Sequence, residues 1–95
     1  MSKYEFDLSD CRTPEEIHRV IGEKLSLPEY YGGNLDALYD VLTDPHDPWH
    51  LVFRGLEAAK EKVGVKYMSR FEKMCRRATE NSADVKIEFE VSGLT

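Results

Sequence analysis

Three short segments with strand-like patterns alternate along the chain with segments whose patterns are helical. Residues 4–8 and 85–91 alternate apolar with charged side chains, which predicts strands with one exposed face. Residues 51–53 are wholly apolar, which is typical of a strand covered on both faces. Strands separated by helices imply parallel crossover connections. The sequence therefore predicts an α/β fold, a three-stranded parallel sheet packed with helices, with residues 51–53 as the central strand.

Helix-start signals precede two of the intervening segments. Thr13 is a suitable N-cap, Pro14 suits the first helical position and Glu16 completes a capping box. Asn34 is expected to cap a second helix, whose apolar stripe is Leu35, Leu38 and Leu42. The composition from residue 56 to 79 is helical, and Gly64 is expected to divide it in two. The buried side of the later piece is predicted to contain Tyr67, Met68, Phe71, Met74, Cys75 and Ala78.

Length and charge limit the classes of function. Ninety-five residues suffice for one domain, so residues 1–95 are expected to form a single unit that works through its surface. A net charge of −5 argues against direct nucleic-acid binding, which needs clustered cations, and favours a basic partner. No apolar stretch approaches the roughly 20 residues needed to span a membrane. Cys11 and Cys75 are too few for a secreted disulfide framework, so we expect a cytoplasmic protein with reduced thiols.

Catalytic and metal-binding patterns are weak. Asp36 and Asp40 are four residues apart, hence about 6 Å along a helix axis, but carboxylates on an exposed helix face are more often solvated charges than a catalytic pair. His46 and His50 lie near aspartates, yet no cysteine joins them and neighbouring prolines disrupt regular ligand spacing. We therefore expect no enzyme activity, no metal and no cofactor.

Tyrosines gather around the start of the second helix. Tyr30, Tyr31 and Tyr39 lie beside paired glycines and aspartates. Tyrosine is enriched in the cores of protein interfaces, because it buries a large area at low entropic cost and keeps a hydroxyl for hydrogen bonding. The sequence therefore predicts a partner-binding surface here. The alternative is that one or two of the three tyrosines pack beneath the loop, which for Tyr31 is an equally good explanation.

Residues 27–43 read LPEYYGGNLDALYDVLT, which closely resembles the signature of the barstar family. The order of the expected elements on either side agrees with the α/β fold of that family. The resemblance implies an intracellular inhibitor, monomeric when free, that occludes the active site of a basic microbial ribonuclease in a one-to-one complex. The positions that it assigns to partner binding are Tyr30, Tyr31, Gly32, Asn34, Asp36, Tyr39, Asp40 and Thr43.

The resemblance also implies individual roles. Tyr30 would stack on a catalytic imidazole of the nuclease, and Asp36 and Asp40 would meet its arginines and lysines. Asp40 would be the central anchor, in the place of a substrate phosphate, because cations arranged for an anion also receive a carboxylate. Gly32 and Asn34 would shape the loop.

The chain also departs from the family pattern. Tyr39 stands where the best-known member has tryptophan, so an aromatic side chain is kept. Residues 44–45 replace a glycine-tryptophan pair, and Trp49 is a candidate to supply the lost contact. An ungapped alignment places Lys73 at a glutamate position, whereas a longer helix would let Glu72 face the site instead. These departures leave an alternative open, a barstar-like binding module whose partner is not a barnase-type ribonuclease.

Overall fold

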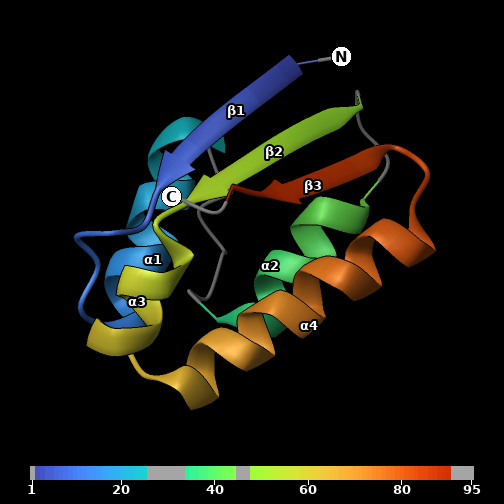
Figure 1. Cartoon of the computed structure of the whole chain (residues 1–95). Coiled ribbons are helices and arrows are strands. Elements are labelled where there is room, and N and C mark those ends of the chain that lie inside the picture. The colour runs from blue at the N-terminus through green and yellow to red at the C-terminus, as the bar shows by residue number, and fades with distance from the viewer. Residues whose placement is uncertain (1, 26–33, 45–47, 91–95) are drawn as a thin grey trace.

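The computed structural model describes residues 2–25, 34–44 and 48–90 of the chain (Figure 1). Three strands and four helices follow one another in this part, in the predicted order, and Gly64 separates the last two helices as expected. Their bounds are β1 Ser2–Asp7, α1 Pro14–Leu25, α2 Leu35–Thr43, β2 Trp49–Arg54, α3 Leu56–Lys62, α4 Val65–Asn81 and β3 Val85–Phe89. None of these helices combines the length and the apolar composition needed to cross a membrane.

The strands form one parallel sheet in the order β1-β2-β3, so β2 is the central strand as predicted. Phe6, Phe53 and Phe89 pair in register across the sheet. The ring of Phe53 stacks on that of Phe6 at a centroid distance of 5.0 Å and on that of Phe89 at 5.8 Å. This row specifies the register, because a slip by one residue would turn each ring to the opposite face.

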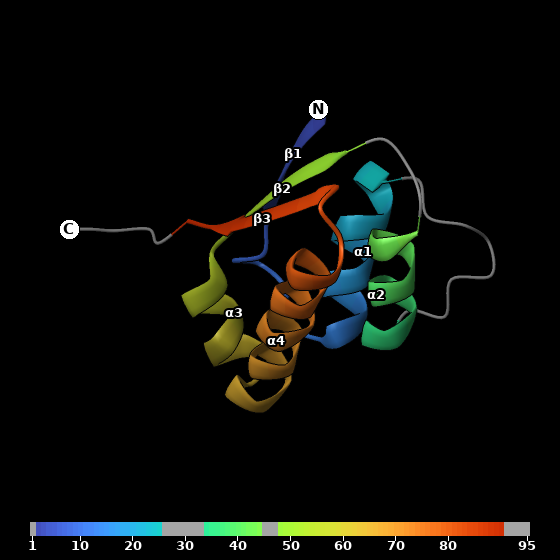
Figure 2. The same cartoon turned by 90° about the vertical axis from the view of Figure 1, so that its right-hand side faces the viewer.

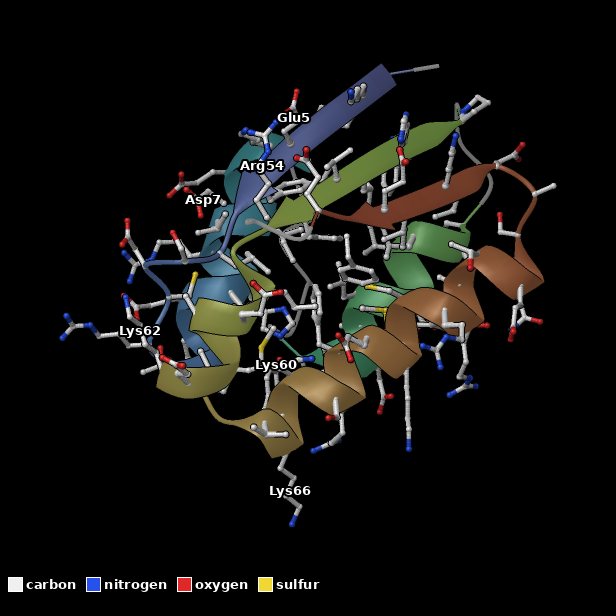
Figure 3. All side chains as sticks on the ribbon, viewed as in Figure 1. Glu5, Asp7, Arg54, Lys60, Lys62 and Lys66 are labelled. Carbon is white, nitrogen blue, oxygen red and sulfur yellow. The ribbon has the colours of Figure 1, made fainter. Side chains whose placement is uncertain are left out.

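The described helices all lie on one face of the sheet (Figure 2). The opposite face carries charged side chains, and Arg54 of β2 forms ion pairs there with Glu5 of β1 and with Glu90 (Figure 3). Val52 lies among these side chains and is only 4% exposed. Strand β2 is thus covered on both faces, as the sequence indicated. Helices cover one face, and the stems of charged side chains cover the other.

The core lies between the sheet and the helices. Phe53 is near its centre, because its ring also meets Phe71 of α4 edge-on, with centroids 5.1 Å apart. Cys11 and Cys75 are buried free thiols, and Cys75 lies on the inward face of α4 as predicted, where burial raises its pKa. The helices also contribute Ile17, Ile21, Leu38, Leu42, Met68 and Ala78.

Side chains cap the two helices whose starts the sequence predicted. The Thr13 hydroxyl accepts a hydrogen bond from the backbone N–H of Glu16 at 3.2 Å. The Glu16 carboxylate accepts one from the backbone N–H of Arg12 at 2.8 Å, one residue earlier than in a regular capping box. The Asn34 side chain accepts one from the N–H of Ala37 at 2.8 Å. These bonds satisfy backbone donors that a helix start leaves unpaired.

Two further features of the helical layer constrain the chain. Gly55, between β2 and α3, has φ 73°, in the left-handed region that favours glycine, and a Cβ added there would lie 2.6 Å from the backbone nitrogen of Ser9.

His18 of α1 is only 5% exposed, and its Nε2 lies 2.7 Å from the Tyr67 hydroxyl of α4. Desolvation lowers the pKa of His18, because burial disfavours the charged imidazolium.

Candidate functional site

The helix α2 turns two carboxylates toward solvent because its other side is buried. The buried residues, each at most 9% exposed, are Leu35, Leu38 and Leu42. Asp36 and Asp40 project from a different side and are exposed. The Asn34 cap fixes where the helix begins, so it also helps to fix which side chains face outward.

A groove of about 400 Å³ runs between α2 and α4, which lie side by side (Figure 1). Its α2 wall is formed by Asp36, Tyr39 and Asp40. Its α4 wall is formed by Arg70, Lys73 and Arg77. Apolar lining comes from Leu35 and Met74, which are largely buried. An acidic wall therefore faces a basic wall across one groove.

The opposite charges of the two walls are not joined. Within the described part of the chain, neither Asp36 nor Asp40 forms an ion pair with Arg70, Lys73 or Arg77. The space between the walls is large enough for side chains of another molecule. Both sets of charges are therefore accessible to a partner that enters the groove.

Tyr39 connects the two helices. Its ring lies under the guanidinium of Arg77, with Cζ 5.1 Å from the ring centroid. Its hydroxyl accepts a hydrogen bond from the side-chain amide of Asn81 at 2.8 Å. The residue is half-buried against the core, so it serves the packing of α2 on α4 as well as lining the groove.

Five residues that the sequence assigned to partner binding lie on α2 or at its start. Asp36, Tyr39 and Asp40 come together in the groove. Asn34 caps the helix, and the half-buried Thr43 donates its hydroxyl hydrogen to the carbonyl oxygen of Tyr39 at 2.8 Å. The assigned residues that lie outside the described part of the chain are Tyr30, Tyr31 and Gly32.

The structure distinguishes the two candidates on α4. Lys73 lines the groove, so a cation stands opposite the carboxylates of α2. Glu72 is turned toward α3, where its carboxylate lies 3.3 Å from the Nζ of Lys60. Trp49, the candidate for a replacement aromatic contact, begins β2 rather than lying in a loop, and it packs half-buried against the core without lining the groove. Neither Glu72 nor Trp49 therefore lines the groove, and whether either contacts a partner stays a prediction.

Sequence reasoning missed Arg70 and Arg77. With Lys73 they recur at intervals of three and four residues, which places three cations on one face of a helix. That spacing is visible in the sequence. It does not say which helix this face meets, and the pairing with α2 comes from the tertiary structure.

The described residues include no group of three or more histidine, cysteine or acidic side chains arranged to hold a metal ion. His50, considered as a ligand, lies on the open face of the sheet and hydrogen-bonds to Glu88 of the neighbouring strand. That bond lowers the pKa of the Glu88 carboxyl, because it stabilises the charged form. The other candidate ligand, His46, lies outside the described part of the chain.

Comparison with known proteins identifies the family of the chain. The family model described as Barstar (barnase inhibitor) matches residues 1–92. The chain belongs to the barstar family. Among barstar-like relatives, the Bacillus subtilis (strain 168) protein named "Putative ribonuclease inhibitor YrdF" is 40% identical over 65 residues, which are 67% of this chain and 71% of the relative. Both names describe inhibitors rather than enzymes, and the parallel three-stranded sheet with its helices is a barstar-like α/β fold.

Proposed function

We propose that this chain inhibits a basic ribonuclease by placing the exposed face of α2, with the segment before it, in the active site of the enzyme. The observation that carries the proposal is the pair Asp36 and Asp40. Both are exposed, they lie one helical turn apart on one wall of the groove, and neither has an ion-pair partner among the described residues. Carboxylates in this arrangement match the cations with which a ribonuclease holds the phosphates of RNA. The Barstar family model supports this assignment.

Within this proposal Asp40 is the central anchor. Its carboxylate would be desolvated among guanidinium and ammonium groups at the place of a substrate phosphate, so RNA and inhibitor would compete for the same cations. Inhibition would then occur by occlusion, in a one-to-one complex formed inside the cell that makes the enzyme. The further contacts proposed from the family motif are Tyr30, Tyr31, Gly32, Asn34, Asp36, Tyr39 and Thr43.

The test uses purified barnase as the probe. RNA cleavage is measured against increasing amounts of the parent chain, and calorimetry gives the stoichiometry and the dissociation constant. Asp40→Ala should weaken binding by about 2 to 5 kcal/mol, roughly 30-fold to several-thousand-fold, because cations of the enzyme would be left buried without a partner. The matched control is Glu61→Ala, which removes an exposed helical carboxylate on α3, away from the groove, and should leave the affinity unchanged.

Two results would oppose this proposal in different ways. If Asp40→Ala inhibits barnase as tightly as the parent, the assignment of the anchor is wrong. If the chain binds a ribonuclease without loss of RNA cleavage, it acts as a barstar-like binding module rather than by occlusion. The basic wall of the groove favours the binding-module alternative, because its cations would repel a wholly basic partner surface.

A further inference from the structure

The basic wall of the groove is unusual for this chain. The protein carries a net charge of −5, yet the charged side chains that line the groove are two carboxylates and three cations. The cations, all from one face of α4, are Arg70, Lys73 and Arg77. The surface that we propose for partner binding is therefore mixed in charge, with the signs separated by helix.

The three cations differ in their contacts within the chain. Arg77 is held over the ring of Tyr39. Arg70 and Lys73 are exposed, and neither forms an ion pair in the described part of the chain. By contrast, Lys60 is paired with Glu72 at the other side of α4. Arg70 and Lys73 are therefore accessible to an acidic group of a partner.

Other lysines of the helical layer lie outside the groove. The ammonium group of Lys62 donates a hydrogen bond to the carbonyl oxygen of Ser9 at 2.9 Å, so it has an internal partner (Figure 3). Lys66 is exposed at the first turn of α4 and points away from the rest of the molecule (Figure 3). It does not line the groove. Lys66 therefore serves as a matched cation on the same helix outside the proposed surface.

One docking surface must meet both walls together. Packed helices lie about 8–10 Å apart from axis to axis, which is comparable to the Debye length of roughly 8 Å at physiological ionic strength. A wholly basic surface would be attracted by Asp36 and Asp40 but repelled by Arg70 and Lys73. A wholly acidic surface would be attracted by Arg70 and Lys73 but repelled by Asp36 and Asp40. Like charges brought together at an interface weaken the binding of a partner.

We infer that the partner carries an acidic side chain beside the cations that receive Asp36 and Asp40, and that Lys73, with Arg70, binds this acidic group. The inference rests on the proposed function and specifies its target as a ribonuclease with a carboxylate on the rim of its basic active site. In this complex the acidic wall provides the anchor. The basic wall selects among ribonucleases that share the same catalytic cations.

A charge-exchange experiment tests the inference. The probes are catalytically inactivated barnase and a set of barnase variants in which single basic residues on the rim of the active site are replaced by glutamate. Each probe is titrated with the parent chain, Lys73→Glu, Lys73→Gln, Lys66→Glu and Asp40→Ala. Lys66→Glu changes the net charge as much as Lys73→Glu does, and it lies on the same helix outside the groove. Urea unfolding of each variant shows whether the free chain remains folded.

The parent should bind at least one rim-glutamate barnase about tenfold more tightly than unmodified barnase, and Lys73→Glu should reverse this preference. Lys73→Gln should abolish the preference without reversing it, and Lys66→Glu should behave as the parent does. The inference is overturned if Lys73→Glu and Lys66→Glu bind all probes alike, or if the parent prefers unmodified barnase to every variant. Two results would bear on the proposed function instead. Full affinity of Asp40→Ala would refute the anchor assignment, and no binding of any probe by the parent would refute the proposed inhibition of a barnase-type ribonuclease.

Discussion

The ring of Tyr39 on α2 lies beneath the guanidinium of Arg77 on α4. The Tyr39 hydroxyl accepts a hydrogen bond from Asn81, one turn beyond Arg77 on α4. The two walls of the groove are therefore joined by a residue that the sequence assigned to partner binding. A side chain in this position contributes to the folded state before any partner arrives. Its substitution must be judged on stability as well as on affinity.

Tyr39→Phe should destabilise the free chain by about 0.5 to 1.5 kcal/mol, because it keeps the ring and loses the hydrogen bond to Asn81. Asn81→Ala should cost a similar amount, and the double substitution should cost little more than either alone, since both remove the same bond. Urea unfolding of the three variants measures this. Fully additive losses would show that the hydrogen bond does not stabilise the packing of α2 on α4.

Asp40→Ala should leave the free energy of unfolding within about 0.5 kcal/mol of the parent, or raise it slightly. Asp40 is exposed and lies one turn from the like-charged Asp36, so it adds repulsion to the helix as well as solvation. The measurement is urea unfolding in the absence of any partner. A large loss of stability would mean that the carboxylate has a structural role, and the effect of the same substitution on binding would then need another explanation.

Gly55→Ala should destabilise the chain by about 2 kcal/mol or more. An L-residue at φ 73° is strained by about 1 to 2 kcal/mol, and the added Cβ would also collide with the backbone of Ser9. Gly55→Asn separates these causes, because asparagine tolerates the left-handed region but carries the same Cβ. Thermal unfolding that shows full recovery with asparagine would mean that backbone strain alone, and no steric overlap, accounts for the loss.

Stability should fall as the pH is lowered through about 6.5, and His18 should account for part of the fall. Desolvation lowers the folded-state pKa of His18 below its unfolded value, although the charge of Glu15 acts in the opposite direction. As the pH falls, the unfolded chain therefore binds the proton before the folded chain does. The stability linked to His18 is complete above the unfolded pKa and is lost as the pH falls below it. For one proton the slope is at most about 1.4 kcal/mol per pH unit.

The measurement for His18 compares urea unfolding at pH 7.5 and 5.5 for the parent and for His18→Gln. Glutamine keeps a polar group near the Tyr67 hydroxyl and cannot titrate in this range. The parent should lose more stability than the variant between the two pH values. Equal losses would show that His18 titrates alike in the folded and unfolded chains.

Local patterns in the sequence predict much of this fold, because the decisive signals act over a few residues. The caps at Thr13 and Asn34 and the break at Gly64 depend on local backbone chemistry, and the structure confirms each of them. The central position of β2 also follows from its apolar run. The charged side chains that cover Val52 do not follow from a local pattern, because they belong in part to neighbouring strands.

The site is predicted less completely for a related reason. The exposed carboxylates of α2 follow from helical spacing within one element, and the structure places both in the groove. The opposing cations become part of the site only through the packing of α2 on α4, which no local pattern encodes. The same packing decides that Lys73 rather than Glu72 stands opposite the carboxylates.

The two walls of the groove come from different connections of the parallel sheet, in which β2 pairs with both of its neighbours. The helix α2 belongs to the connection between β1 and β2, whereas α4 belongs to the connection between β2 and β3. Each parallel pairing requires distant parts of the chain to meet, which slows folding relative to structures held by local contacts. A folding intermediate in which only the first connection has docked would present Asp36 and Asp40 without the opposing cations. Under the proposed function, such an intermediate would carry the carboxylates of the anchor and lack the cations proposed to discriminate between ribonucleases.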